Sequence, residues 1–144
     1  MLNILRAEHT WQQAGAYYVR IQGMARQHHI ALEQEFDAHD TPRTKYIVLL
    51  EDDFPIATCR LFKSGEGVAE IGRVVVLPEY RGKGYGRRVV SEAERWLKEL
   101  GYAKVALESR DVAVDFYRKM GYAPDYSVKL EKGMFPCVYM EKQL

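Results

Sequence analysis

The spacing of hydrophobic residues changes along the chain, and each change predicts a new secondary-structure element. A short strand is expected at Leu2–Arg6, followed by a helix from Ala14 to about Gln27, where apolar side chains recur at three- and four-residue steps. Strand-like stretches follow at residues 45–50, 56–62 and 68–77. The turn residues 51–53 separate the first two, which therefore predict a β-hairpin.

The second half of the chain alternates strands with helices. A helix is expected to follow the glycines at 82, 84 and 86, because apolar side chains from Val89 to Leu100 share one face and Gly101 ends the pattern. Further elements are predicted as a strand at 104–107, a helix from Asp111 to Met120, and strands near 126–130 and 138–141.

This order of elements predicts an α/β (α+β) fold in one domain, residues 1–144. Consecutive strands in the first half favour antiparallel pairing, and the strand–helix alternation in the second half favours a parallel neighbour. We therefore expect a mixed, mostly antiparallel central sheet of six or seven strands, flanked by helices.

Composition narrows the functional class. The chain is 47% hydrophobic and 28% charged, with a formal net charge of +1, which argues against a nucleic-acid partner. Its apolar runs are too short to cross a bilayer, and its first residues do not resemble a signal peptide. The two cysteines, Cys59 and Cys137, indicate free thiols rather than a disulfide framework. We expect a cytoplasmic protein that does not bind membranes.

One segment carries recognisable chemistry, namely Val74–Arg88, which runs from a β-branched strand through a glycine loop into a helix. Glycines let the main chain approach a ligand, and the first turn of a helix offers unpaired N–H groups with a partial positive charge. Arg81, Lys83, Arg87 and Arg88 add positive charge. The segment therefore predicts a phosphate or pyrophosphate site.

Other phosphate-binding loops do not fit this segment. A Walker A loop needs Gly-Lys followed by Ser or Thr, which the chain lacks. The dinucleotide fingerprint has a different glycine spacing and follows a first strand, and a protein kinase needs further catalytic segments.

The segment resembles the Arg/Gln-x-x-Gly-x-Gly/Ala loop of the GNAT superfamily of acetyl-CoA-dependent N-acetyltransferases, with Arg81, Gly84 and Gly86 at the defined positions. Ala113–Tyr122 is similar to the family's A-x-x-F-Y-x-x-x-G-F/Y helix, and the resemblance covers roughly residues 44–142. The first third is similar to small bacterial GNAT proteins of undefined substrate.

The resemblance implies transfer of an acetyl group from acetyl-CoA to a primary amine, by direct attack in a ternary complex. Tyr117 corresponds to the general acid that protonates the departing thiolate, and Glu70 to the general base of some members. The implied coenzyme-binding residues are Val74, Val75, Val76, Arg81, Gly82, Lys83, Gly84, Tyr85, Gly86, Arg87, Ser109 and Tyr117. No metal is implied, and adjacent His28 and His29 would point apart on a helix.

Several alternatives stay open at this stage. Tyr117 could be a packing residue, Glu70 a surface residue, and Arg110 either a coenzyme phosphate contact or a solvent-facing residue. The acidic group Glu33, Glu35, Asp37 and Asp40 is either a solvated loop or an attractor for a cationic amine.

A non-catalytic acyl-CoA sensor, or an acyltransferase with another donor, would share the fold. The acceptor is expected to be a small-molecule or peptide amine, and a homodimer is conceivable through an exposed strand edge.

Overall fold

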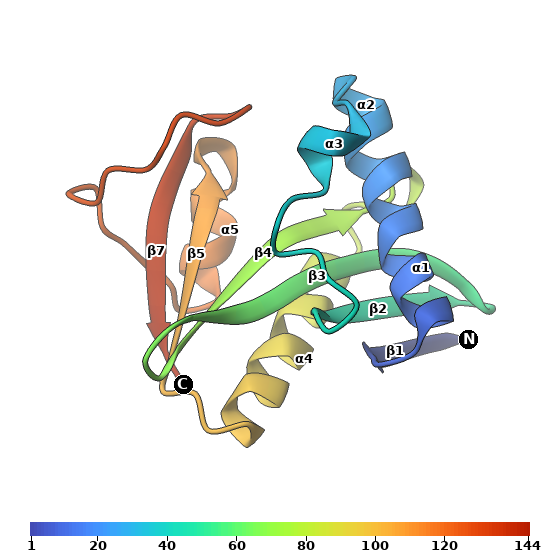
Figure 1. Ribbon diagram of the computed structural model, residues 1–144, viewed down its shortest axis with the longest axis horizontal. Helices are drawn as coiled ribbons and strands as arrows, with labels where there is room; N and C mark the ends of the chain where they lie inside the picture. The colour runs from blue at the N-terminus through green and yellow to red at the C-terminus, as the bar shows by residue number, and fades with distance from the viewer.

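The computed structural model describes all residues, 1–144, and contains one seven-stranded sheet with helices packed against it (Figure 1). The strands are β1 (Leu2–Ala7), β2 (Lys45–Glu51), β3 (Phe54–Gly65), β4 (Val68–Val76), β5 (Lys104–Arg110), β6 (Ala123–Pro124) and β7 (Cys137–Gln143). The helices are α1 (Thr10–Arg20), α2 (Arg26–His28), α3 (Leu32–Glu35), α4 (Tyr85–Glu99) and α5 (Val114–Lys119). A π-helix, η1 (Ile21–Ala25), joins α1 to α2, and two 3₁₀ turns, η2 (Pro78–Tyr80) and η3 (Asp111–Ala113), precede α4 and α5.

The sheet has the order β1-β2-β3-β4-β5-β7-β6, and only β4 and β5 run parallel. A parallel neighbour requires a crossover, which α4 provides. The β4–β5 pairing covers only Val68–Glu70 against Lys104–Ala106, after which the two strands separate (Figure 1). Residues 71–76 of β4 thus pair with no strand on the β5 side, and we call this stretch the open edge of β4.

Helices α1 and α4 pack on opposite faces of the sheet, as the alternation along β2 shows. Tyr46, Val48 and Leu50 form a buried cluster with Ala16 of α1. Ile47 and Leu49 belong to the larger core, together with the inward side chains of α4. This two-sided burial explains why β2 reads as a continuous apolar run.

Strand β4 contains a β-bulge at Arg73 and Val74. Arg60 pairs with Gly72 and Thr58 pairs with Val75, so two residues of β4 lie opposite the single residue Cys59 of β3. Arg73 has φ +49°, a conformation that is unfavourable for a bulky side chain. The extra residue shifts the alternation of faces by one position, so that Val75 takes the face that Gly72 has before the bulge; Val75 lies beside η1 and Val76 beside α4.

The predicted mixed sheet flanked by helices is confirmed, but one predicted strand is wrong and one predicted helix starts later than expected. No strand forms at 126–130, because Asp125 starts a turn by accepting hydrogen bonds from Ser127, and β7 pairs instead with the two residues of β6. The helix expected from Asp111 begins at Val114, because Asp111 lies in the 3₁₀ turn η3. None of the helices has the length and apolarity needed to span a membrane.

Candidate active site

The loop between β4 and α4 presents a row of unpaired main-chain amides. Arg81 N–H donates to Pro78 O, and the next amide with a protein acceptor is that of Arg88, which bonds Gly84 O. The N–H groups from Gly82 to Arg87 therefore have no partner within the protein. Such a row at the start of a 15-residue helix is the arrangement that binds phosphate groups.

The loop needs its glycines for different reasons. Gly82 and Gly84 have φ values of +79° and +82°, which side chains rarely adopt. Gly86 instead has ordinary backbone geometry, and a Cβ on it would lie 3.5 Å from Phe116 Cζ and 3.7 Å from Val76 Cγ2. The first two glycines thus shape the loop, whereas at Gly86, where β4, α4 and α5 meet, a methyl group would make only ordinary van der Waals contacts.

Arg81 supports the loop with its side chain. Its Nε donates to Val76 O at 2.9 Å, and its Nη2 donates to Gly23 O of η1 at 3.0 Å. Gly23 can lie this close because a Cβ there would meet Val75 Cγ1 at 2.6 Å. The guanidinium thereby ties the loop to the end of β4 and to the π-helix, so its role in this structure is to brace the loop.

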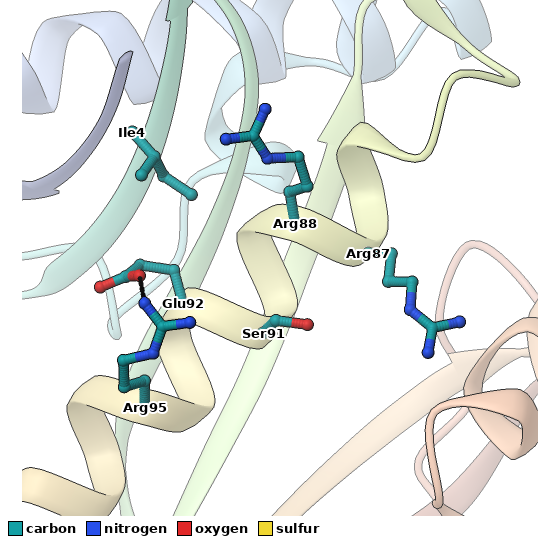
Figure 2. A pocket seen from close by; sticks show the side chains of 6 residues that line it. All are labelled: Ile4, Arg87, Arg88, Ser91, Glu92 and Arg95. Atoms are coloured by element: carbon teal, nitrogen blue, oxygen red, sulfur yellow. Dashed lines mark hydrogen bonds and ion pairs between the residues drawn. The ribbon is translucent and has the colours of Figure 1, made fainter. Parts of the chain in front are cut away.

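The basic residues at the start of α4 point in different directions. In Figure 2, Arg87 and Arg88 extend to opposite sides of the helix, and Arg88 lies on the side of Ile4. Neither forms an ion pair, whereas Arg95 on the same helix pairs with Glu92 at 2.8 Å. Their charges, with that of Lys83, make the loop surroundings positive, as an anion site requires.

The open edge of β4 lies between Glu70 and the start of the glycine loop. Val74, Val75 and Val76 all lie on it. Six residues of strand cover roughly 20 Å. An extended ligand anchored at the loop can therefore lie along the open edge in the manner of an added strand.

Glu70 is the last β4 residue paired with β5, and it is partly buried. Burial, with a smaller contribution from the nearby Glu108 carboxylate, raises its pKa to about 7. Glu70 forms no ion pair, since Arg60 and Arg73 beside it bond to other carboxylates. A carboxylate with this pKa can accept a proton near neutral pH.

Tyr117 lies on α5, next to Phe116, whose ring lies beside Gly86 of the loop. The residue is 8% exposed and packs edge-on against Phe116 and Tyr122. Burial raises its pKa above the ordinary value, with a smaller contribution from Cys59, so the phenol stays protonated. Its hydroxyl forms no hydrogen bond within the protein, in contrast to Tyr122, which donates to Glu94 at 2.6 Å.

Ser109 and Arg110 have partners inside the protein. Ser109 is 2% exposed, and its hydroxyl donates to Arg110 O at 2.7 Å. The Arg110 guanidinium lies 4.0 Å from the Phe135 ring centroid, and His28 meets the same ring edge-on. The Arg110 guanidinium thus packs on an aromatic ring, and its buried Nε has no hydrogen-bond partner within the protein.

Within the acidic group, Glu33 is exposed and forms no ion pair, as a solvated loop would have it, whereas the other three residues bond to arginines. Glu35 and Asp40 are almost fully buried, and their carboxylates bond to Arg20, which is 0% exposed, at 2.9 and 2.6 Å. Asp37 and Asp40 bond to Arg60, and Glu35 and Asp37 bond to Arg73. We call these residues the arginine–carboxylate network: Arg20, Arg60, Arg73, Glu35, Asp37 and Asp40.

Comparison with known proteins identifies the family. The chain matches the Acetyltransferase (GNAT) family over residues 4–122. The chain belongs to the GNAT acetyltransferase family. An uncharacterized acetyltransferase of Streptococcus pyogenes is 32% identical over 104 residues, which cover 72% of this chain and 71% of that protein. The uncharacterized protein YyaT of Bacillus subtilis is 31% identical over 118 residues, covering 81% and 78%.

Solved structures confirm the GNAT fold along the whole chain. The crystal structure of a presumed N-acetyltransferase from Lactobacillus plantarum superposes with a TM-score of 0.91 at 33% identity, covering 99% of this chain and 98% of that one. The PaiA N-acetyltransferase from Thermoplasma acidophilum, in complex with coenzyme A, superposes with a TM-score of 0.74 at 17% identity, covering 100% and 99%. At that identity the second likeness shows the fold alone.

Sequence reasoning missed two parts of this GNAT site. It predicted the loop, Glu70 and Tyr117 as site residues, but not the bracing role of Arg81 or the arginine–carboxylate network. One signal was available for the network, because Arg20 and Arg60 stand within otherwise apolar runs close to an acidic segment. A buried arginine requires carboxylate partners.

Proposed function

We propose that this GNAT protein transfers an acetyl group from acetyl-CoA to a primary amine. The observation that carries the proposal is the row of unpaired amides from Gly82 to Arg87, set at the end of the open edge of β4. The amides would bind the pyrophosphate of coenzyme A, and the main chain of Val74–Val76 would bind its pantetheine arm. The coenzyme A complex of the Thermoplasma protein, which shares the fold, supports this cosubstrate.

The amine would bind beside Glu70. An amine is nucleophilic only when neutral, and a carboxylate with a pKa of about 7 can take the proton that the ammonium form loses. The amine nitrogen then attacks the thioester carbonyl, the new C–N bond forms, and the C–S bond breaks. The nitrogen loses its second proton to water as the amide forms. The acetylated amine and the thiolate of coenzyme A are the products.

Tyr117 would meet the departing thiolate. Its hydroxyl is protonated and has no other partner, so it can donate a hydrogen bond to sulfur as negative charge develops there. A thiol has an ordinary pKa of about 8.5, below that of a phenol, so we expect stabilisation of the thiolate more than complete proton transfer.

Direct attack is favoured over an acetyl-cysteine intermediate. Cys59, the cysteine near Tyr117, is 0% exposed, and burial raises its pKa, so its thiol stays protonated. A buried, protonated thiol is a poor nucleophile.

Calorimetric titration of the purified protein with acetyl-CoA tests the proposal, with dephospho-coenzyme A and ATP as controls. We expect micromolar binding of acetyl-CoA, followed by release of free thiol when primary amines are added. Absence of binding would refute the proposal. Binding without acetyl transfer to any small-molecule or peptide amine would identify an acyl-CoA sensor instead.

A further inference from the structure

The bulge in β4 adopts a conformation that its own sequence does not favour. Arg73 has φ +49° in a position where glycine is the preferred residue. Strain of this kind persists where surrounding contacts hold the backbone, and it is common at functional sites. We therefore expect the contacts of the Arg73 side chain to hold the bulge in this conformation.

Arg73 reaches across to the acidic segment. Its Nε lies 3.2 Å from Glu35 Oε2, and its Nη2 donates to Glu35 O at 3.0 Å and to Asp37 Oδ2 at 3.2 Å. These bonds connect the bulge to α3, which lies 38 residues earlier in the chain. A bidentate guanidinium fixes direction as well as distance.

The partners of Arg73 are themselves fixed. Glu35 is 3% exposed and bonds to the buried Arg20, while Asp37 bonds to Arg60 of β3 at 2.9 Å. Burial alone would raise the pKa of Asp37, but the Arg60 guanidinium, the His39 N–H and the Arg73 guanidinium together hold the pKa below its ordinary value. Arginines of both α1 and β3 thus hold the two carboxylates that Arg73 contacts.

We propose that Arg73 is a positioning residue that clamps the β4 bulge and so aligns the main chain of Val74–Val76 with the thioester. The bulge is the point at which an extra residue shifts the alternation along β4. Its geometry therefore determines the direction of the main-chain groups on the open edge. This inference rests on the proposed acetyltransferase function. It assigns Arg20, Glu35 and Asp37 a supporting role at a distance from the reacting atoms.

The test uses three substitutions of Arg73, namely Arg73→Ala, Arg73→Gly and Arg73→Lys. It compares them with Asp37→Asn, which removes the Arg73–Asp37 ion pair by changing the carboxylate. Arg43→Ala is the matched control, because Arg43 is exposed in the same region and forms no ion pair. Turnover with a primary amine gives kcat and KM, and calorimetry gives the affinities for acetyl-CoA and for coenzyme A.

We expect Arg73→Ala to lower kcat by about tenfold or more while the KM for acetyl-CoA changes little, because a misplaced main chain affects the reaction more than anchoring at the loop. The preference for acetyl-CoA over coenzyme A should shrink in the same variant, a change that simple loss of stability would not produce. Arg73→Lys should recover part of the loss, and Asp37→Asn should show a smaller loss.

Arg73→Gly separates the side-chain contacts from backbone strain, since glycine accepts φ +49° without cost. Wild-type kcat in Arg73→Gly and Asp37→Asn would overturn the proposal. If Arg73→Ala does not fold, Asp37→Asn decides alone. If the wild type binds acetyl-CoA but acetylates nothing, the proposed function fails, and the ratio of acetyl-CoA to coenzyme A affinity still tests the clamp.

Discussion

At the residue scale, burial sets the acid–base chemistry of Glu70 and Tyr117. Burial raises both pKa values, but with different consequences. It brings the Glu70 carboxyl to about 7, within reach of neutral pH, and it keeps the Tyr117 phenol protonated throughout the physiological range. The partly buried Glu70 and the buried Tyr117 therefore suit opposite roles, one as base and one as acid.

The base role of Glu70 predicts a pH dependence. The carboxylate is the active form, so kcat/KM should rise with pH and level off above about 7. Glu70→Gln should remove this limb and lower kcat/KM by about a hundredfold at pH 8. The measurement is a pH–rate profile of both proteins with saturating acetyl-CoA; an unchanged profile in the variant would exclude Glu70 as the base.

The same raised pKa predicts an effect on stability. The charged form of Glu70 is disfavoured in the folded protein, so folding stability is lost as pH rises from the ordinary value of about 4.5 through about 7. Glu70→Gln should therefore gain stability relative to the wild type at pH 8 and not at pH 4. Urea unfolding at the two pH values checks the sign, and an equal difference at both would contradict it.

Tyr117→Phe isolates the acid role. Because the hydroxyl has no partner within the protein, its loss should leave the fold and acetyl-CoA affinity nearly unchanged while kcat falls by about tenfold to a hundredfold. Tyr102→Phe is the control, since Tyr102 follows the C-terminal end of α4, opposite the loop. Steady-state kinetics with calorimetry would reveal a mere packing role if kcat stayed at the wild-type level.

At the element scale, the site depends on how a strand, a loop and a helix follow one another. β4 supplies the open edge, the glycine loop supplies unpaired amides, and α4 supplies the positive end of its dipole. These three elements are consecutive in the chain, so their order is encoded locally. Their fine geometry depends on Arg81, which bonds to Val76 and to the distant Gly23.

Gly84 has a positive φ and Gly86 does not, so substitutions at these two loop glycines form a matched pair of variants. Gly84→Val forces a β-branched residue to φ +82°, so acetyl-CoA affinity should fall by about tenfold or more. Gly86→Ala adds a methyl group with ordinary contact distances, so affinity should stay within about threefold. Calorimetric titration compares the two, and equal losses would show that the positive φ is not the deciding feature.

At the scale of the whole molecule, the arginine–carboxylate network joins α1, α3, β3 and β4 at one side of the sheet. Buried ion pairs contribute little net stability, but removal of one partner leaves an uncompensated charge. The network therefore holds the α1 side of the protein in register with the β4 bulge.

Arg20→Met tests the network as a whole. Loss of this fully buried cation should cost about 3–5 kcal/mol of unfolding free energy, measured by urea denaturation, whereas Arg43→Ala should cost less than about 0.5 kcal/mol. The Arg20 guanidinium overcomes the effect of burial and holds the pKa of Asp40 well below its ordinary value. The stabilisation is thus present above about pH 4 and fades as pH falls further. A difference that persists unchanged at pH 2 would point to packing rather than charge.

Local patterns predicted most of the fold and the chemical core of the site. Apolar periodicity identified α4 and the strands β2 to β5, because each buries a face whose spacing is visible in the sequence. It failed at residues 126–130, whose β-branched and aromatic residues read as a strand although no neighbouring strand pairs with them. Apolar periodicity also missed the π-helix η1, in which Gly23 packs against Val75 of β4.

The sequence by itself determined the family, the order of elements and the anion-binding loop, because glycine spacing, helix start signals and apolar period are local properties. Only the tertiary structure decided where β4 and β5 separate, how the bulge turns Arg73 towards Glu35, and how strongly Glu70 is buried. These features depend on contacts between residues tens of positions apart. A charged residue reads the same in a sequence whether it meets water or a buried partner, and the energetic difference between those two surroundings arises only on folding.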